Sequence, residues 1–235
     1  MMKLRKALYY PEVYISKYAI KYINKIVEAG SGSLKALYNS DNSLIQIITE
    51  DRPKKGPAED ILYENLKFKY DKYLLRDRCI DFSSKYENKK FYPDLILSFE
   101  KYILLIEIDE PYDYIDGLPI HYYTEINGKF YTSDYFWNSN LFEKGFNIIR
   151  FAEIQVFKHL KECLSFIDYT IECFDSFKLP NIEVFKNKIP KLTEEESIRY
   201  SHYNIRDFYL PKNIKAIYKN ENAKRIKKIK ENLFK

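Results

Sequence analysis

The chain has 235 residues, 46% of them hydrophobic, and a formal net charge of +5. These values allow a sizeable core and argue against wholesale disorder. Three cysteines, Cys79, Cys163 and Cys173, stand in apolar segments without a Cys-x-x-Cys spacing, which argues against a disulfide framework and a structural zinc site. No apolar run approaches the ~20 residues of a membrane helix, and the first residues lack the apolar stretch of a signal peptide, so we expect a cytoplasmic protein that does not bind membranes.

The first part of the chain contains a predicted helix, a strand and a second helix. Apolar residues at helical spacing predict a helix over 12–28, and residues 43–49 are typical of a strand. A charged linker over 51–57 leads into a helix over 58–66, and the last proline of the linker suits a helix's first turn. We interpret residues 1–56 as an N-terminal accessory segment.

Two strands follow, joined by a tight turn at 100–101. The first covers 91–99. The second, over 102–110, is apolar on both faces until its end, as a central strand covered on both sides should be. Residues 111–132 contain an Asp-Gly pair and an Asn-Gly pair, which predict a long loop or a hairpin.

Helices and strands continue to alternate after this loop. A helix that begins at Ser133 or Asp134 runs to Lys144, and Gly145 is a natural stop. A strand over 146–151 follows. Next come an amphipathic helix over 154–167 and a helix over 193–209 that opens with a capping-box pattern.

This order of elements predicts an α/β protein with a mixed central sheet flanked by helices. The predicted core covers residues 57–170 and has additions at both ends. Residues 171–235 are expected to form a C-terminal helical extension with a basic tail.

Carboxylates gather at the end of the predicted central hairpin. Glu107 and Asp109 are two residues apart in a strand, so they point to the same side, with about 6.5–7 Å between their Cα atoms. Pairing of the two strands places Asp94 near the same end. Three carboxylates that share a site repel one another, and a divalent cation with oxygen ligands relieves this repulsion. The alternative is ordinary strand-end polarity, with an acid paired to Arg150.

The Pro-Asp pair at 93–94, a short connection and Glu107-x-Asp109 at the end of an apolar strand resemble the PD-(D/E)xK nucleases of the restriction-endonuclease-like superfamily. The series looks most similar to the branch that contains the very-short-patch-repair endonucleases. It covers about 57–165. In that branch the first core helix carries a Glu, which Glu59 matches, and a His follows the motif strand, which His121 matches.

The resemblance implies a restriction-endonuclease-like core and a Mg²⁺-dependent (or Mn²⁺-dependent) endonuclease that cleaves DNA phosphodiester bonds. Asp94 and Glu107 would be metal ligands, joined by the carbonyl of Ile108. Asp109 would be a further ligand or a group that orients water. Glu59 would support the ligands from outside, although it is equally a first-turn acid favoured by the helix dipole.

One departure concerns the lysine that usually ends the motif, because Asp109 stands in its place. That lysine helps polarise the attacking water, so its task would pass to another group, for which His121, Lys129 and Lys101 are candidates. The Arg often found one turn into the next helix is Asn138 here. The alternative function is therefore a catalytically inactive nuclease-fold protein that binds nucleic acid or a partner protein.

Basic residues are the candidate contacts to a DNA backbone. Arg150, at a strand end, either contacts phosphate or anchors an acid. Residues 219–235 contain seven Lys or Arg and two Glu, a local balance of +5. The phosphate-binding residues expected in this tail are Lys224, Arg225, Lys227 and Lys228. A solvated helix end is the alternative interpretation, and a homodimer or a protein partner stays open.

Overall fold

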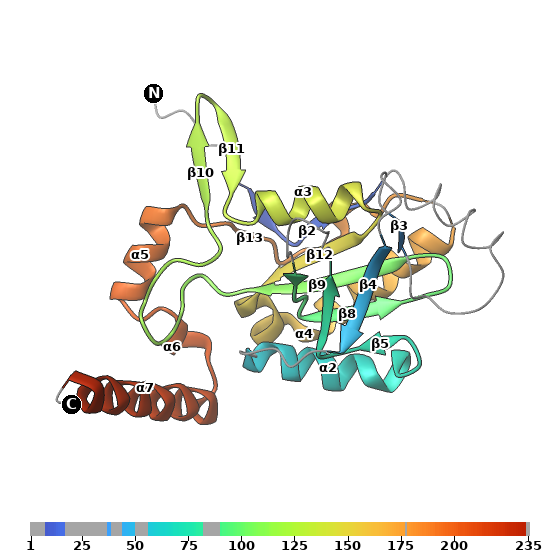
Figure 1. The fold of residues 1–235 in the computed structure, drawn as a ribbon. Helices are drawn as coiled ribbons and strands as arrows, with labels where there is room; N and C mark the ends of the chain where they lie inside the picture. Colours follow the sequence, from blue (N-terminus) through green and yellow to red (C-terminus); the bar gives the residue numbers. More distant parts are fainter. Residues whose placement is uncertain are drawn as a thin grey trace. The chain divides into compact units, whose positions relative to one another are not determined.

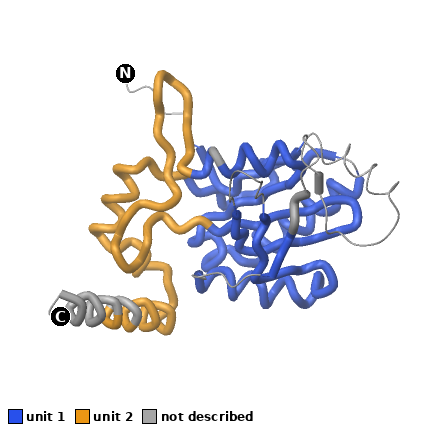
Figure 2. The backbone as a smooth tube through the Cα atoms, in the orientation of Figure 1, with its two compact units in different colours: residues 1–108, 134–190 blue, residues 109–133, 191–235 orange. Residues whose placement is uncertain are grey.

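The computed structural model divides the chain into two compact units (Figure 2). Unit 1 comprises residues 1–108 and 134–190, and unit 2 comprises residues 109–133 and 191–235. The structure describes residues 8–16, 37–38, 44–49, 56–81, 90–176 and 178–233. Both units are assembled from separate stretches of sequence. The division into residues 1–56, 57–170 and 171–235 stays a prediction.

Unit 1 is built around a mixed five-stranded sheet with the strand order β2-β12-β9-β8-β5 (Figure 1). Its strands are β2 (Glu12–Tyr14), β5 (Leu74–Leu75), β8 (Leu95–Ser98), β9 (Ile103–Asp109) and β12 (Asn147–Ala152). β9 lies in the middle of the sheet, and all of its residues are buried. The prediction of a mixed sheet with an apolar central strand is therefore confirmed.

One face of this sheet, the α4 face, is covered by α2 (Pro57–Tyr70) and α4 (Glu153–Asp175) (Figure 1). Leu104 and Ile106 of β9 lie on this face and are fully buried. α2 begins with a proline in its first turn, as predicted. α4 continues well beyond the predicted helix over 154–167, because apolar residues of its last turns also pack on the core.

The opposite face, the α3 face, is covered by α3 (Tyr135–Glu143) (Figure 1). Leu141 of α3 packs with Ile96 of β8 and Leu105 of β9 in a second core cluster. The helix ends as predicted, since Gly145 follows it with a φ of 96°, a left-handed conformation that glycine adopts readily. β9 thus contributes alternate side chains to two different cores.

A second, four-stranded antiparallel sheet has the order β3-β4-β6-β7. Its strands are β3 (Leu37–Tyr38), β4 (Leu44–Thr49), β6 (Arg78–Asp81) and β7 (Lys90–Phe91). The predicted strand over 43–49 is confirmed. The predicted strand over 91–99 is wrong in its extent, because Pro93 cannot donate to a strand ladder and separates β7 from β8.

The N-terminal residues join the central sheet instead of beginning a helix. β2 pairs antiparallel with β12, and Val13 lies opposite Ile149. The predicted helix over 12–28 is therefore wrong at its start. Val13 packs against the core, and three residues are too few to distinguish helical from strand spacing. β1 (Tyr9–Tyr10) pairs with β13 (Ile189–Pro190), which follows the 3-10 helix η1 (Ile182–Val184); residues 17–36 lie outside the described part.

Unit 2 combines a hairpin with three helices. Its elements are β10 (Tyr123–Ile126), β11 (Lys129–Thr132), α5 (Glu194–His202), α6 (Arg206–Tyr209) and α7 (Lys212–Leu233). The hairpin was one of two predicted forms of residues 111–132. Asn127 (φ 52°) and Gly128 (φ 74°) form its turn, and two successive left-handed residues are what a type I′ turn requires.

The predicted helix over 193–209 is divided into α5 and α6. Its start is confirmed, because the Thr193 hydroxyl accepts a hydrogen bond from Glu196 N at 3.2 Å and the Glu196 carboxylate accepts one from Thr193 N at 2.8 Å. Asn204 has a φ of 49°, which no helix interior tolerates, so the chain turns there. Arg206 is buried beyond this turn and donates to the Tyr112 carbonyl at 2.8 Å.

Candidate metal centre

The last residues of β9 carry acidic side chains on the α3 face. Glu107 and Asp109 share the face of Leu105, while Ile108 points to the opposite core. The antiparallel register of β8 and β9, continued by one pair, places Asp94 opposite Glu107. The carboxylate of Asp94 is held there because its Oδ2 accepts a hydrogen bond from the backbone N of Ile108 at 2.6 Å.

All three of these carboxylates are buried. The exposed fraction is 5% for Asp94, 7% for Glu107 and 2% for Asp109. An ionised carboxylate is costly to remove from water unless hydrogen bonds, opposite charges or a metal ion replace the lost hydration. Hydrogen bonds, such as the one that Asp94 accepts from Ile108 N, or positive charges nearby must therefore stabilise these acids.

Asp109 has two such neighbours. Nδ1 of His121, in the loop before β10, lies 3.7 Å from Asp109 Oδ1. The ammonium Nζ of Lys191 lies 3.9 Å from Asp109 Oδ2, and the Lys191 side chain is completely buried. A lysine that is fully removed from water is rare without an acidic partner. Asp109 is therefore an ionic centre with an imidazole on one oxygen and an ammonium on the other.

Asp134 is the second acid with a buried cation beside it. It precedes α3 as predicted, but its side chain makes no capping hydrogen bond. Its Oδ2 instead lies 3.4 Å from Nη2 of Arg150, and Nη1 of the same guanidinium donates to Asn138 Oδ1 at 3.0 Å. Arg150 is 2% exposed. Its burial and both contacts favour the interpretation of Arg150 as an anchor for an acid over that of a phosphate contact.

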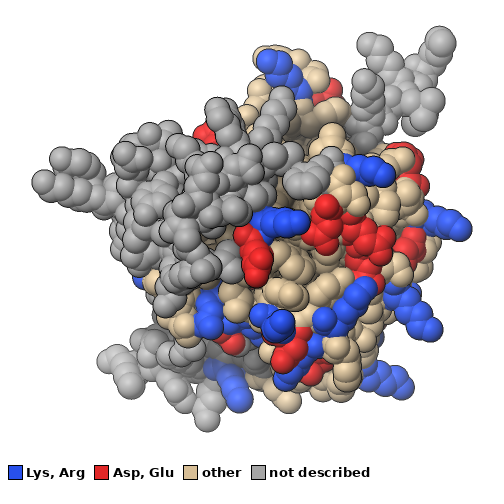
Figure 3. Space-filling model, turned by 90° about the vertical axis from the view of Figure 1, so that its right-hand side faces the viewer, with Lys and Arg blue, Asp and Glu red and all other residues tan. Residues whose placement is uncertain are grey.

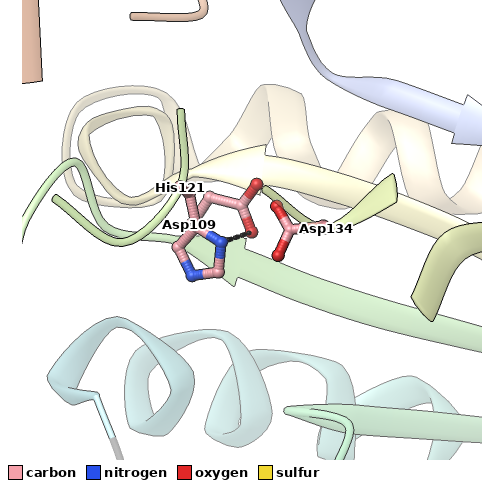
Figure 4. Close-up of side chains that lie close together, drawn as sticks. All are labelled: Asp109, His121 and Asp134. Carbon is pink, nitrogen blue, oxygen red and sulfur yellow. Dashed lines mark ion pairs between the residues drawn. The ribbon is translucent and has the colours of Figure 1, made fainter. Parts of the chain in front are cut away.

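Asp109, His121 and Asp134 form a group of potential metal ligands, with one ligand atom from each residue within 4.8 Å of the others. In Figure 4 the imidazole of His121 and the carboxylate of Asp134 both approach the carboxylate of Asp109. Two of these residues, Asp109 and His121, are among the predicted catalytic residues. The third, Asp134, is predicted only as a helix start.

The donor set of this group fits a divalent cation. Two carboxylates and one imidazole provide the oxygen and nitrogen ligands of many transition-metal sites. Mg²⁺ prefers oxygen ligands alone, so the imidazole makes Mn²⁺ the better match of the two predicted ions. The predicted ligands Asp94 and Glu107 lie on the same face, and their participation as ligands stays a prediction.

The other predicted site residues have separate positions. Glu59 is buried at the start of α2, and its Oε1 accepts a hydrogen bond from Gly56 N at 2.7 Å, which is the role of a helix-capping acid. Ile108 uses its backbone N for Asp94. Lys101 lies in the turn before β9, at the opposite end of that strand from the acids, and Lys129 is exposed in β11.

The basic tail forms the second half of α7. Lys224 is exposed there, whereas the side chains of Arg225, Lys227 and Lys228 lie outside the described residues. On the described surface seen in Figure 3, Lys and Arg side chains are interspersed with Asp and Glu side chains. The described part of this face is therefore not uniformly positive.

Lys191 and the ligand role of Asp134 are the features that sequence reasoning missed. Lys191 precedes the capping box of α5, and nothing local to its sequence indicates that it is buried beside Asp109. For Asp134 the sequence carries a signal, because an acid that precedes a helix can either cap that helix or pair with an arginine at a strand end. The capping pattern alone does not distinguish these two roles.

Comparisons of the chain with family models, with curated proteins and with solved structures found no match. Among the helices that the structure describes, none is both long and apolar enough to cross a membrane.

Proposed function

We propose that this chain is a metal-dependent endonuclease that hydrolyses phosphodiester bonds in DNA. The observation that carries the proposal is the Asp109–His121–Asp134 group, because its ligand atoms meet at the end of a buried strand that also bears Glu107. The resemblance of the Pro-Asp and Glu-x-Asp series to the PD-(D/E)xK nucleases supports the same chemistry.

The charges around the end of β9 favour a divalent ion. Among the described groups at this end, four carboxylates outnumber two cations, so a divalent cation would offset the excess of negative charge. These groups are Asp94, Glu107, Asp109, Asp134, Arg150 and Lys191. Because a buried uncompensated charge is strongly destabilising, neutrality is a physical reason for this site to take up an ion of charge +2.

Each residue has a role that follows from its contacts. Asp109 and Asp134 would hold the ion with their carboxylates, and His121 would add one imidazole nitrogen as a third ligand. A bound divalent cation lowers the pKa of a water ligand and stabilises negative charge on a phosphate under attack. Lys191 supplies a positive charge beside Asp109, where the motif lysine is missing from the sequence. Arg150 keeps Asp134 in place.

The proposal is tested with purified protein in two measurements. Isothermal titration with Mn²⁺ and Mg²⁺ should show binding of a divalent ion, with Mn²⁺ the tighter. Supercoiled plasmid should be nicked in the presence of either ion, and a chelator should stop the reaction. If the protein binds neither ion, or binds them but leaves single- and double-stranded DNA intact, the endonuclease function is contradicted.

A specific observation favours the non-cleaving alternative. Asp109 and Asp134 each have a cationic partner already, Lys191 and Arg150 respectively, so these two acids are balanced without a metal. In such a site the ion pairs take the place of a bound metal. The alternative predicts that DNA or a partner protein is retained in a binding assay with and without chelator, while no cleavage occurs.

A further inference from the structure

Asn138 holds a buried hydrogen-bond donor whose orientation is fixed. It lies four residues after Asp134 in α3 and is 3% exposed. The guanidinium of Arg150 carries only donors, so the atom that it contacts at 3.0 Å must be the carbonyl Oδ1 of Asn138. The amide nitrogen Nδ2 is the remaining atom, and it has no hydrogen-bond acceptor among the described residues.

A buried hydrogen-bond donor without an acceptor indicates that a ligand supplies the acceptor. Buried side-chain donors nearly always have an acceptor, and an amide that could turn would exchange its oxygen and nitrogen to find one. Here Arg150 prevents the exchange. Residues four apart in a helix lie on the same side, with about 5–6 Å between their Cβ atoms. Asn138 therefore lies beside Asp134, which belongs to the candidate metal group.

The chemistry of the donor indicates which ligand atom it takes. An amide N–H is neutral and donates best to an oxygen that carries negative charge. A ligand oxygen held by a divalent ion still has lone pairs to share, and a buried hydrogen-bond donor beside the ion can bind one of them. A non-bridging phosphate oxygen has this character, and a phosphodiester presents two of them.

We propose that Nδ2 of Asn138 donates a hydrogen bond to a non-bridging phosphate oxygen of the ligand bound at the metal group. This inference rests on the proposed function and makes it more specific, because it names the group that recognises phosphate. Arg150 acts through Asn138 as a positioning residue, since its contact with Oδ1 decides which way the amide points. A DNA backbone and free phosphate share this chemistry.

The direct test observes the amide itself. The side-chain amide resonances of Asn138 and Asn140 are assigned in ¹⁵N-labelled, Mg²⁺-loaded protein. They are then followed in two separate titrations, one with inorganic phosphate and one with a thymidine dinucleotide joined by one phosphodiester. We expect the Asn138 amide to shift in a saturable manner and that of Asn140, two residues further along α3, to shift much less. The titrant that produces the shift identifies the monoester or the diester as the ligand.

A matched pair of variants adds an affinity measurement. Asn138→Asp keeps an acceptor for Arg150 and replaces the donor by an oxygen, whereas Asn140→Asp adds the same charge to the same helix. We expect Asn138→Asp to lower the affinity for the phosphate ligand at least about tenfold more than Asn140→Asp does, as loss of a hydrogen bond to a charged group requires. Mg²⁺ affinity should not fall in either variant.

The outcomes separate this inference from the function on which it rests. If the ion binds and phosphate binds, but neither the Asn138 resonance nor the Asn138→Asp variant responds differently from its Asn140 counterpart, the inference is wrong and the metal centre stands. If the wild-type protein binds no divalent ion, the proposed function fails and the inference fails with it. The resonance measurement uses only wild-type protein, so it decides the question even if Asn138→Asp does not fold.

Discussion

The two faces of the central sheet bury different kinds of side chain. The α4 face is apolar from end to end, and its strand residues pack against the helices α2 and α4. The α3 face begins in the same manner, with residues such as Ile96 and Leu105, but it ends in Glu107 and Asp109. Both faces are buried to the same degree.

The two faces differ in what burial contributes to the free energy of folding. An apolar face gains stability in proportion to its buried area, and close packing adds to it. A buried ionic face gives little net stability, because the desolvation of its charges offsets their attraction. The α3 face keeps such charges at one end of β9 only. A concentrated cost of this kind is characteristic of functional sites.

The largest effect is expected from Asp109→Asn. The substitution keeps the size of the side chain and removes the charge that binds the ion, so metal-dependent cleavage should fall by about 10³-fold or more, in the range found when a group that stabilises transition-state charge is lost. Plasmid nicking rates measure this. Glu125→Gln, which changes an exposed acid of β10, is the control. Equal rates in Asp109→Asn and wild type would remove Asp109 from the mechanism.

The second-largest effect is expected from Arg150→Met. The methionine fills part of the volume but leaves the partly buried Asp134 without its guanidinium partner, which costs at most about 3–5 kcal/mol of unfolding free energy, the range for fully buried pairs. Because a divalent ion at Asp134 supplies the missing positive charge, Mn²⁺ should restore more stability to this variant than to wild type. Urea unfolding with and without Mn²⁺ tests both points, and an equal effect of the ion on the two proteins would speak against Asp134 as a ligand.

Leu104→Ala probes the apolar face. Leu104 is completely buried in β9 on the α4 face, so its truncation should cost about 2–5 kcal/mol through lost burial and a new cavity. Metal affinity, measured by titration at a temperature where the variant is folded, should stay within about twofold of wild type. A large loss of affinity would show that the two faces are not independent.

The smallest effect is expected at Cys163, in the helix that covers the apolar face. Burial, and to a lesser degree the charge of Glu162, raises the pKa of the Cys163 thiol to about 12. The thiol is thus neutral and unreactive in the folded protein at pH 8, and a thiol reagent should modify it only on unfolding. Since the folded pKa lies above the unfolded one, its contribution to stability is complete below about pH 8.5 and declines as the pH rises towards 12.

Much of the fold and part of the site follow from local sequence signals. The apolar run of β9, the proline that opens α2 and the Asn-Gly turn of the β10–β11 hairpin act over a few residues, and each was predicted. Glu107 and Asp109 could be placed on one face because a strand has a period of two. The positions of these acids needed no knowledge of the rest of the chain.

The missed features depend on contacts between residues far apart in sequence. β2 is a strand because β12 offers it a partner, and the three residues of β2 carry no decisive pattern of their own. Lys191 is paired with Asp109 by the tertiary fold, and the sequence around it indicates only a helix start. Arg150 was expected at a strand end, but only the tertiary structure shows that Asp134 is its partner. Local periodicity predicts elements and faces, while charge pairing is decided by the tertiary structure.

The pairing of the first strands with late ones has a consequence for how the chain is made. Ser16, just after β2, donates to the side chain of Asn147 across 131 residues of sequence, and β1 pairs with a strand that comes later still. At about 5–20 residues per second, a ribosome needs on the order of 10 s to produce the partner of β2. The strands β1 and β2 must therefore wait, with their edges unpaired, until the residues of β12 and β13 have been synthesised. Such long-range closure is entropically slow, so translation speed and chaperone access bear directly on the yield of folded protein.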